Sequence, residues 1–291
     1  MSGILLYGGW FQGLASAAYA ALAAYFWRTR WHAVAAHSGE DPPAYMRGWE
    51  RAALLVPLVL HGTLLWRELF AATELHFGFA YALSAMLWIG VLIYWIESLF
   101  LRLAGFEPLL LPIAAAAVPL PSFFPGHASL YAASTGFRLH LALAMLAYSL
   151  FTIAMLHALL MTLIERRLHR LRETSPEQRA PLAGPLAHLP PLLTLERLLF
   201  RIIGVAFVLL TLTLATGIGY SESIFGRPLK FDHKTVFAIA SWLTFALLLG
   251  GRVLRGWRGR TALRWTLAGF VMLLLTYVGS RFVLEVLLGR A

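Results

Sequence analysis

Residues 137–164 read FRLHLALAMLAYSLFTIAMLHALLMTLI, and Arg138 is the one Asp, Glu, Lys or Arg among them. An α-helix rises 1.5 Å per residue, so about 20 apolar residues cross the hydrocarbon layer of a membrane. The run is therefore long enough to form a transmembrane helix. Its two histidines, His140 and His157, then belong to a membrane helix, where titratable side chains are rare.

The composition of the whole chain agrees with this run. Of the 291 residues, 59% are hydrophobic and 13% are charged, which leaves too little polar surface for a soluble globular enzyme. The chain contains no cysteine, which excludes disulfides, thiolate metal ligands and thiol redox chemistry. We expect one integral membrane domain over residues 1–291.

Eight apolar runs, bounded by charge, Pro or Gly, predict the architecture. The expected fold class is all-α, a polytopic transmembrane helix bundle of about eight spans. The fourth run is short and contains Pro112 and Pro119, so it is either a kinked span or a re-entrant segment; we interpret it as a span. The first run lacks a preceding basic segment and is interpreted as a retained helix. The predicted spans are residues 3–27, 52–70, 76–100, 109–120, 137–164, 199–219, 235–250 and 262–288.

The distribution of Lys and Arg predicts the orientation. Seventeen of the 24 fall in alternate connections and six in the others, with Arg281 inside the last span. Cytoplasmic loops carry the excess of positive charge, so both termini are expected on the outer, periplasmic side of a bacterial inner membrane. The formal charge of +10 then reflects topology, and a nucleic-acid partner is not expected. This orientation requires the fourth run to cross. The Pro-rich connection over residues 165–196 is expected to be an irregular loop, with one turn of helix extending the fifth span.

Histidines near membrane depth are the candidate functional residues. His61 lies nine residues into the second predicted span, about 14 Å from its inner end and near the middle of the bilayer. His140 lies about 6 Å below the outer end of the fifth span. Each is either a ligand or a neutral imidazole that hydrogen-bonds to a neighbouring helix. His76, His127 and His233 are expected on the outer side, and His157 lies about 26 Å along the helix from His140, toward the inner side.

The pattern favours haem over a hydrolytic metal centre. The sequence has no His-Glu-x-x-His spacing and no cysteine, whereas imidazoles from separate apolar helices suit a haem iron. His61 and His140 differ by about 10 Å in expected depth, a gap that a tilted haem b and two side chains span. Four cations on the charge-poor outer side are candidate partners for the propionates: Arg138, Arg227, Lys230 and Lys234.

Several segments carry a resemblance to a known family. They are residues 232–242 (DHKTVFAIASW), 251–252 (GR), 256–260 (GWRGR) and 277–279 (YVG). This pattern resembles the CcsA/HemX-like cytochrome c assembly family of haem-handling membrane proteins, over about residues 50–291. His140 and the helix that follows resemble the first outer haem histidine of that family, and His61 resembles the early-span histidine of its shorter members.

The chain departs from the haem lyase members of this family at two places. Phe231-Asp232 stands where they carry a tryptophan-rich motif ending in Trp-Asp, and no second outer histidine follows the last-but-one span. The resemblance therefore implies the shorter branch, which binds haem, and not an enzyme that attaches haem to an apocytochrome. His233, next to Asp232, is a third candidate ligand in our hypothesis.

The expected function is haem handling or delivery for cytochrome c assembly, with an assembly partner or apocytochrome as the protein partner. An electron-transferring cytochrome b subunit is the main alternative, and it requires ligand pairs in both leaflets. A haem-independent membrane adaptor that regulates tetrapyrrole synthesis is a second alternative. A transporter is a third, but the sequence shows no repeat between its halves.

Overall fold

Helices make up almost all of the structure, a computed structural model that describes residues 2–32, 46–67, 76–100, 106–128, 134–173, 192–225, 233–283 and 286. The predicted all-α class is confirmed, with the small exception of a ladder between two two-residue strands. In chain order the elements are α1 Ser2–Phe26, η1 Trp27–His32, α2 Gly48–Trp66, β1 His76–Phe77, α3 Phe79–Phe100, α4 Glu107–Ala117, α5 Leu120–Phe123, β2 His127–Ala128, α6 Thr135–Glu173, α8 Leu192–Phe225, α9 His233–Arg255, α10 Gly259–Leu274, η3 Leu275–Gly279 and α11 Ser280–Phe282.

Each of the eight predicted spans contains a helix. Within the described residues, five helices are long and apolar enough to cross a membrane: Phe79–Phe100, Thr135–Arg166, Leu192–Gly219, His233–Arg255 and Gly259–Phe282. Only 28% of the apolar stretch of α9 is buried inside the bundle, so most of that stretch lies on the bundle's surface. The total of eight spans and the outer position of the termini stay predictions.

The fourth predicted span is a broken helix. α4 ends at Ala117, and α5 follows after a turn at Val118 and Pro119. The 17 residues of Glu107–Phe123 form a shorter apolar segment than the other candidates. β1, just before α3, pairs with β2, just after α5, and Phe77 lies opposite His127 in the register. The chain therefore returns through α4 and α5 to the end of the bundle at which α3 begins, as a crossing segment would.

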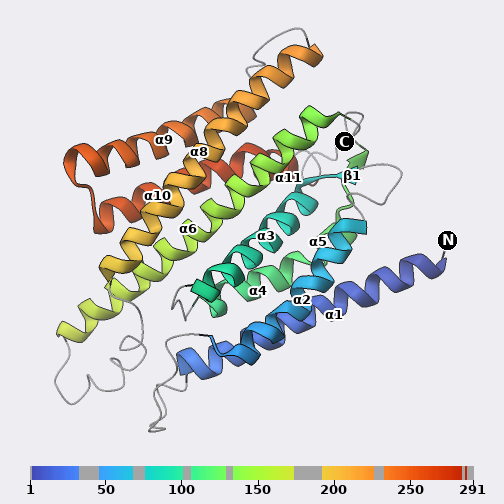
Figure 1. The fold of residues 1–291 in the computed structure, drawn as a ribbon, viewed down its shortest axis with the longest axis horizontal. Coiled ribbons are helices and arrows are strands. Elements are labelled where there is room, and N and C mark those ends of the chain that lie inside the picture. The colour runs from blue at the N-terminus through green and yellow to red at the C-terminus, as the bar shows by residue number, and fades with distance from the viewer. Residues whose placement is uncertain are drawn as a thin grey trace.

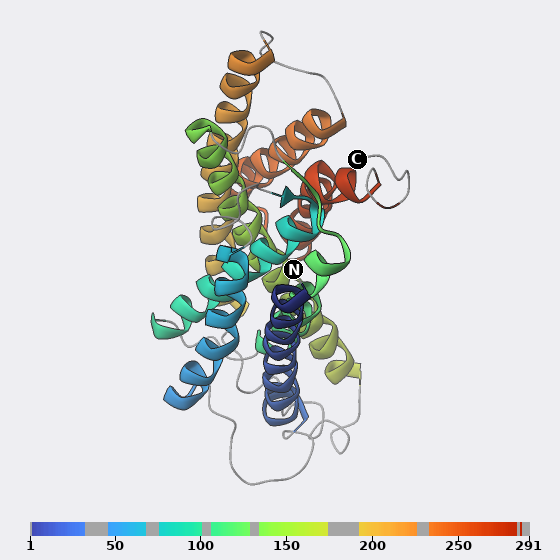
Figure 2. The same cartoon turned by 90° about the vertical axis from the view of Figure 1, so that its right-hand side faces the viewer.

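α3 and α6 occupy the middle of the bundle. α1, α2 and α4 pack on one side, and α8, α9 and α10 pack against α6 on the other (Figures 1 and 2). α6 continues to Glu173, nine residues beyond the predicted end of its span. That extension is about two and a half turns, where the sequence predicted one. α8 begins at Leu192, so both flanks of the Pro-rich connection are helical, and residues 174–191 lie outside the described part of the chain.

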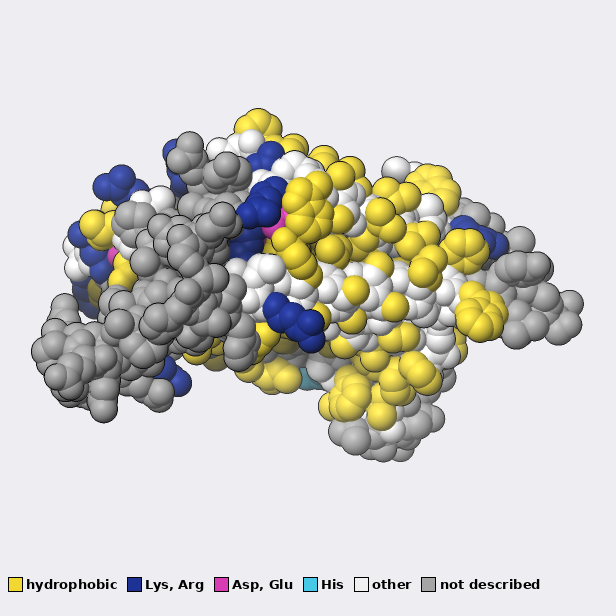
Figure 3. Space-filling view, turned by 90° about the horizontal axis from the view of Figure 1, so that it is seen from below, with side chains coloured by type: hydrophobic (Ala, Val, Ile, Leu, Met, Phe, Trp, Pro, Cys, Tyr) yellow, Lys and Arg dark blue, Asp and Glu magenta, His cyan; other side chains and the backbone are white. Residues whose placement is uncertain are grey.

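Charge gathers at one end of the molecule. The arginine-rich end, as we call it, is formed by the last turns of α6 and α9 and the first turns of α2, α8 and α10. In the view of Figure 3, most of the visible Lys and Arg side chains lie toward one end of the molecule, and hydrophobic side chains cover the middle. Glu50 lies at this end: it pairs with buried Arg30 at 2.7 Å and accepts a hydrogen bond from Tyr25. This buried ion pair ties η1, which continues α1, to the start of α2.

Candidate functional site

His61 is buried in the interface that α2 forms with α1 and α3, with 1% of its surface exposed. A hydrogen bond of 2.8 Å joins its Nε2 to Oγ of Ser84 on α3, which is also buried. Its Nδ1 has no hydrogen-bond partner among the described residues. The ring meets Tyr19 of α1 edge-on, with 5.9 Å between the centroids. The phenol oxygen of Tyr19 is also buried without a partner in the described structure.

Small and aromatic residues set the distance between α2 and α3 at this point. Trp88 on α3 donates a hydrogen bond from Nε1 to the carbonyl of Leu58, 2.8 Å away. A Cβ on Gly62 would lie 2.8 Å from the Trp88 ring, so only glycine permits this approach. Because Gly62 follows His61 directly, the packing that brings α2 against α3 also fixes where the imidazole lies.

His140 lies in the second turn of α6 and packs against α8. Its Nδ1 is 3.1 Å from Oγ1 of Thr216. A Cβ on Gly217 would lie 3.1 Å from the Cε1 of the imidazole, which is tighter than ordinary van der Waals contact. Gly217 therefore makes room for the side chain of His140.

The two histidines face different interfaces of the bundle. His61 contacts α1 and α3, and His140 contacts α8. Their relative depth follows from one contact between α3 and α6, in which Ser149 donates to the carbonyl of Met86. Ser84 lies two residues before Met86, at the level of Ala147 on α6, and His140 lies seven residues farther toward the start of α6. The offset is about 10 Å at 1.5 Å per residue, close to the sequence-based expectation.

An apolar cluster lies between these two regions. It is built from α2, α3 and α6, and Tyr277 of η3 packs against it. Leu65 is one turn beyond His61, and Ala144 and Met145 are about one turn beyond His140. The members are Leu65, Tyr81, Ala82, Ala85, Ala144 and Met145, with Trp88, Ile89, Leu141 and Tyr277 against them. The cluster forms a continuous apolar layer that links the helices carrying the two imidazoles.

The other outer candidates are described in part. His233 is the first residue of α9 and is exposed. Arg138 is exposed in the first turn of α6, and Lys234 is half-buried. Arg227, Lys230 and Asp232 lie outside the described residues. The backbones of His76 and His127 come together in the β1–β2 ladder, at the end of the bundle that the sequence assigned to both.

His157 forms a separate site in the C-terminal half of α6. Its side chain is fully buried, with Nδ1 2.9 Å from the carbonyl of Ile153. Nε2 has no partner among the described residues, and the ring lies on Phe106 with 4.0 Å between the centroids. No group of three or more His, Asp or Glu side chains that could hold a metal ion occurs in the described part of the chain.

Sequence reasoning missed the residues that contact the candidate imidazoles. Ser84, Tyr19 and Thr216 are the nearest polar neighbours, and each is a hydroxyl on an apolar helix. Arg281 was set aside as a cation inside the last span; its guanidinium carbon lies 6.0 Å from the centroid of the Tyr277 ring, beside the apolar cluster. These residues could have been found from the sequence by looking for every polar side chain on an apolar helix, hydroxyls and arginine as well as histidine.

The glycine-rich segment near residue 256 is explained by the α9–α10 turn. Gly256 and Gly259 have positive φ angles of 65° and 52°. A Cβ on Gly251 would lie 2.4 Å from the Trp257 ring, so this glycine is required for the ring to pack on α9. Arg252 pairs with Glu196 of α8 and donates to the carbonyl of Trp257. These motif residues therefore build a helical hairpin and do not contact His61 or His140.

Comparison with known proteins gives the family. The sequence profile described as "Cytochrome C assembly protein" matches residues 49–288, which include α2 and every helix after it. The chain belongs to the cytochrome c assembly protein family. The predicted family resemblance is confirmed, and the matched region contains both candidate imidazoles.

The matches to individual relatives cover different shares of this chain and of each relative. A protein of Azospirillum brasilense described as an uncharacterized 28.8 kDa protein in the nifR3-like 5' region is 31% identical over 89% of this chain and 92% of its own length. Inner membrane protein YpjD of Escherichia coli is 33% identical over 62% of this chain, and the match covers 65% of YpjD. Cytochrome c biogenesis protein CcsA of Nostoc is 35% identical over 36% of this chain, and the match covers 29% of CcsA. Together with the apolar helices, these relatives confirm the predicted inner-membrane localisation.

Proposed function

We propose that this protein binds haem b within the membrane and supplies it during cytochrome c assembly, with His61 as the principal ligand and His140 as the second. Membership of the cytochrome c assembly family supports the role in cytochrome c biogenesis. The observation that carries the proposal is the imidazole of His61, which is 1% exposed and has an Nδ1 without a partner among the described residues.

An unpaired ring nitrogen in an apolar interior has an energetic cost. Leaving a buried donor or acceptor unsatisfied costs about 1–3 kcal/mol, and native proteins rarely tolerate it without a functional reason. A metal bound at the free nitrogen removes this cost. Ser84, which holds the other nitrogen, then orients the imidazole, as groups behind metal-bound histidines commonly do.

The surroundings fit haem in their donor chemistry and polarity. Imidazole is a common axial ligand of haem iron, and when bound the haem is the group that assembly of a cytochrome consumes. The apolar cluster between α2 and α6 excludes water from the region between the two histidines. Arg138, Lys234 and Arg281 supply positive charge that would favour the propionates. His233, exposed at the start of α9, remains a third candidate ligand.

Delivery of haem requires a protein partner. The chain has no cysteine, so reduction of the apocytochrome thiols belongs to another component. Phe231-Asp232 stands where the haem lyase members carry the tryptophan-rich motif, and we therefore assign the chain haem binding and transfer to an assembly partner or apocytochrome, without the covalent attachment step.

One observation favours the alternative of an electron-transferring cytochrome b subunit. His157 is fully buried about 26 Å along α6 from His140, and its Nε2 has no partner among the described residues. A second haem in the inner half of the bundle would use this nitrogen. The number of haems per chain therefore separates the two functions.

The experiment is the haem content of the detergent-purified protein, measured by absorption and by the pyridine haemochrome assay after haem-replete expression. The proposal predicts one haem b per chain, loss in His61→Ala, reduced content in His140→Ala, and no change in His169→Ala, an exposed histidine at the end of α6. A haem-free wild type supports the haem-independent adaptor instead. Two haems per chain, one of them lost in His157→Ala, support the cytochrome b subunit.

A further inference from the structure

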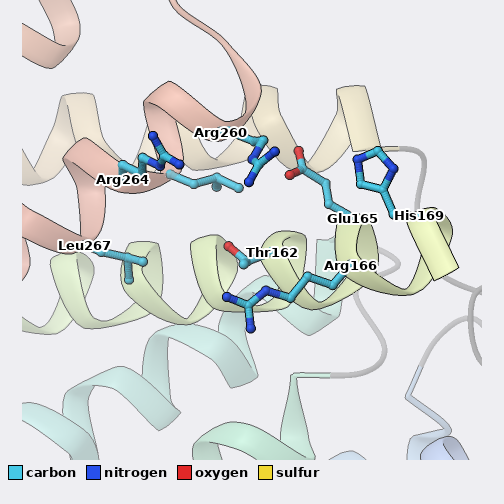
Figure 4. A pocket seen from close by; sticks show the side chains of 8 residues that line it. Thr162, Glu165, Arg166, His169, Arg260, Arg264 and Leu267 are labelled. Carbon is cyan, nitrogen blue, oxygen red and sulfur yellow. The ribbon is translucent and has the colours of Figure 1, made fainter.

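A pocket of about 230 Å³ lies between the end of α6 and the start of α10, at the arginine-rich end and away from both candidate imidazoles. α6 contributes Glu165 and Arg166, and α10 contributes Arg260 and Arg264. Figure 4 shows Arg260 and Arg264 on α10, with Glu165 of α6 pointing toward Arg260. The proposed function makes no use of these side chains.

Positive charge dominates the pocket. Three arginines face one glutamate, and in the described part of the chain none of the three makes an ion pair within 4 Å. By contrast, Arg252 and Arg258 nearby share the carboxylate of Glu196. Unpaired guanidinium groups that converge on one cavity favour an anion, and their planar forks match phosphate oxygens. The cavity is several times the ~30 Å³ that a water molecule occupies, which leaves room for a phosphate group.

The lining changes from polar to apolar along the helices. Arg260 and Arg264 are one turn apart on α10, and so are Leu263 and Leu267, which reach one turn deeper into the span. On α6, His169 lies at the polar end and Thr162 at the deeper end. A phospholipid has the same order, with a phosphate at the interface and acyl chains below it. Basic pockets between helices at a membrane surface bind anionic lipid headgroups for this reason.

We propose that the pocket between α6 and α10 binds the phosphate group of an anionic phospholipid through Arg260 and Arg264, with Arg166 on the facing wall. Glu165 opposes the lipid phosphate by like charge and limits its affinity. Its removal therefore has an effect opposite in sign to removal of an arginine. This site is independent of haem binding.

The test is native mass spectrometry of the full-length protein in detergent with phosphatidylglycerol, phosphatidylcholine or inorganic phosphate. Arg260→Gln/Arg264→Gln is expected to weaken phosphatidylglycerol binding at least tenfold, because each arginine supplies charge-assisted hydrogen bonds. Glu165→Gln is expected to strengthen it severalfold. Arg255→Gln, an exposed arginine at the end of α9 outside the pocket, is the matched control and leaves binding unchanged.

The three ligands distinguish a lipid phosphate from free inorganic phosphate. The lipid assignment is supported if the protein binds phosphatidylglycerol much more strongly than phosphatidylcholine and only the double variant loses this binding. Binding of inorganic phosphate with no preference for phosphatidylglycerol overturns the lipid assignment. Equal phosphatidylglycerol binding in wild type and double variant, or an equal loss in Arg255→Gln, overturns the site. If the double variant does not fold, Glu165→Gln decides, since unchanged or weaker lipid binding contradicts the proposal.

Discussion

The hydrogen bond between Ser84 and His61 offers a direct measure of how the candidate ligand is held. Ser84→Ala removes the 2.8 Å contact and leaves both ring nitrogens of a buried imidazole without partners. An unsatisfied buried polar group costs about 1–3 kcal/mol, and hydrogen bonds between membrane helices are worth up to about 1.7 kcal/mol. We therefore expect Ser84→Ala, without added haem, to lower the free energy of unfolding by about 1–2 kcal/mol.

The assay is reversible unfolding of the purified protein in mixed micelles, run as a double-mutant cycle with His61→Leu. Removing both polar partners leaves an apolar contact, so Ser84→Ala/His61→Leu is expected to be more stable than the sum of the single changes by about 1 kcal/mol or more. Ser241→Ala is the control, since Ser241 is buried and donates only to the carbonyl of Gly269. An additive cycle, or a Ser84→Ala loss no larger than that of the control, would refute the reasoning.

Two further predictions concern the frame of the bundle. Gly251→Ala puts a Cβ 2.4 Å from the Trp257 ring and is expected to lower the free energy of unfolding by about 1–3 kcal/mol. Gly250→Ala is the control, because the space at its Cβ is open and the change is expected to be neutral or stabilising. Equal thermal stability of the two variants in detergent would contradict the packing of Trp257 on α9. Glu50→Gln removes the negative charge that pairs with buried Arg30 and is expected to cost about 1–3 kcal/mol in the same unfolding assay. A loss below 1 kcal/mol would show that this ion pair does not join η1 to α2.

Hydropathy predicted the helices well because the bilayer imposes one rule on each of them. A membrane-spanning backbone must satisfy its own hydrogen bonds, so long apolar runs such as residues 79–100 and 137–164 have one available structure. Helix ends were predicted less well. α6 extends to Glu173 because nothing in the charged sequence ERRLHRLRE stops a helix, while hydropathy marks only the apolar part.

The candidate site was predicted in its residues but not in its contacts. His61 and His140 stand out because imidazoles are rare at membrane depth, and their offset follows from helical rise. Which helix each one faces depends on the packing of α1, α3 and α8, and one sequence does not encode this as a simple period. The glycine-rich motif near residue 256 was recognised as a family pattern, but its structural role was not predicted. That role in the α9–α10 turn depends on how Trp257 packs against Gly251, which only the structure shows.

The axial ligands of the bound iron test the central claim most directly. We predict that electron paramagnetic resonance of the ferric protein shows a low-spin haem with two imidazole ligands, and that His61→Ala, supplied with excess haem, shows no such signal while His169→Ala keeps it. A low-spin signal of unchanged shape and intensity in His61→Ala would contradict ligation by His61.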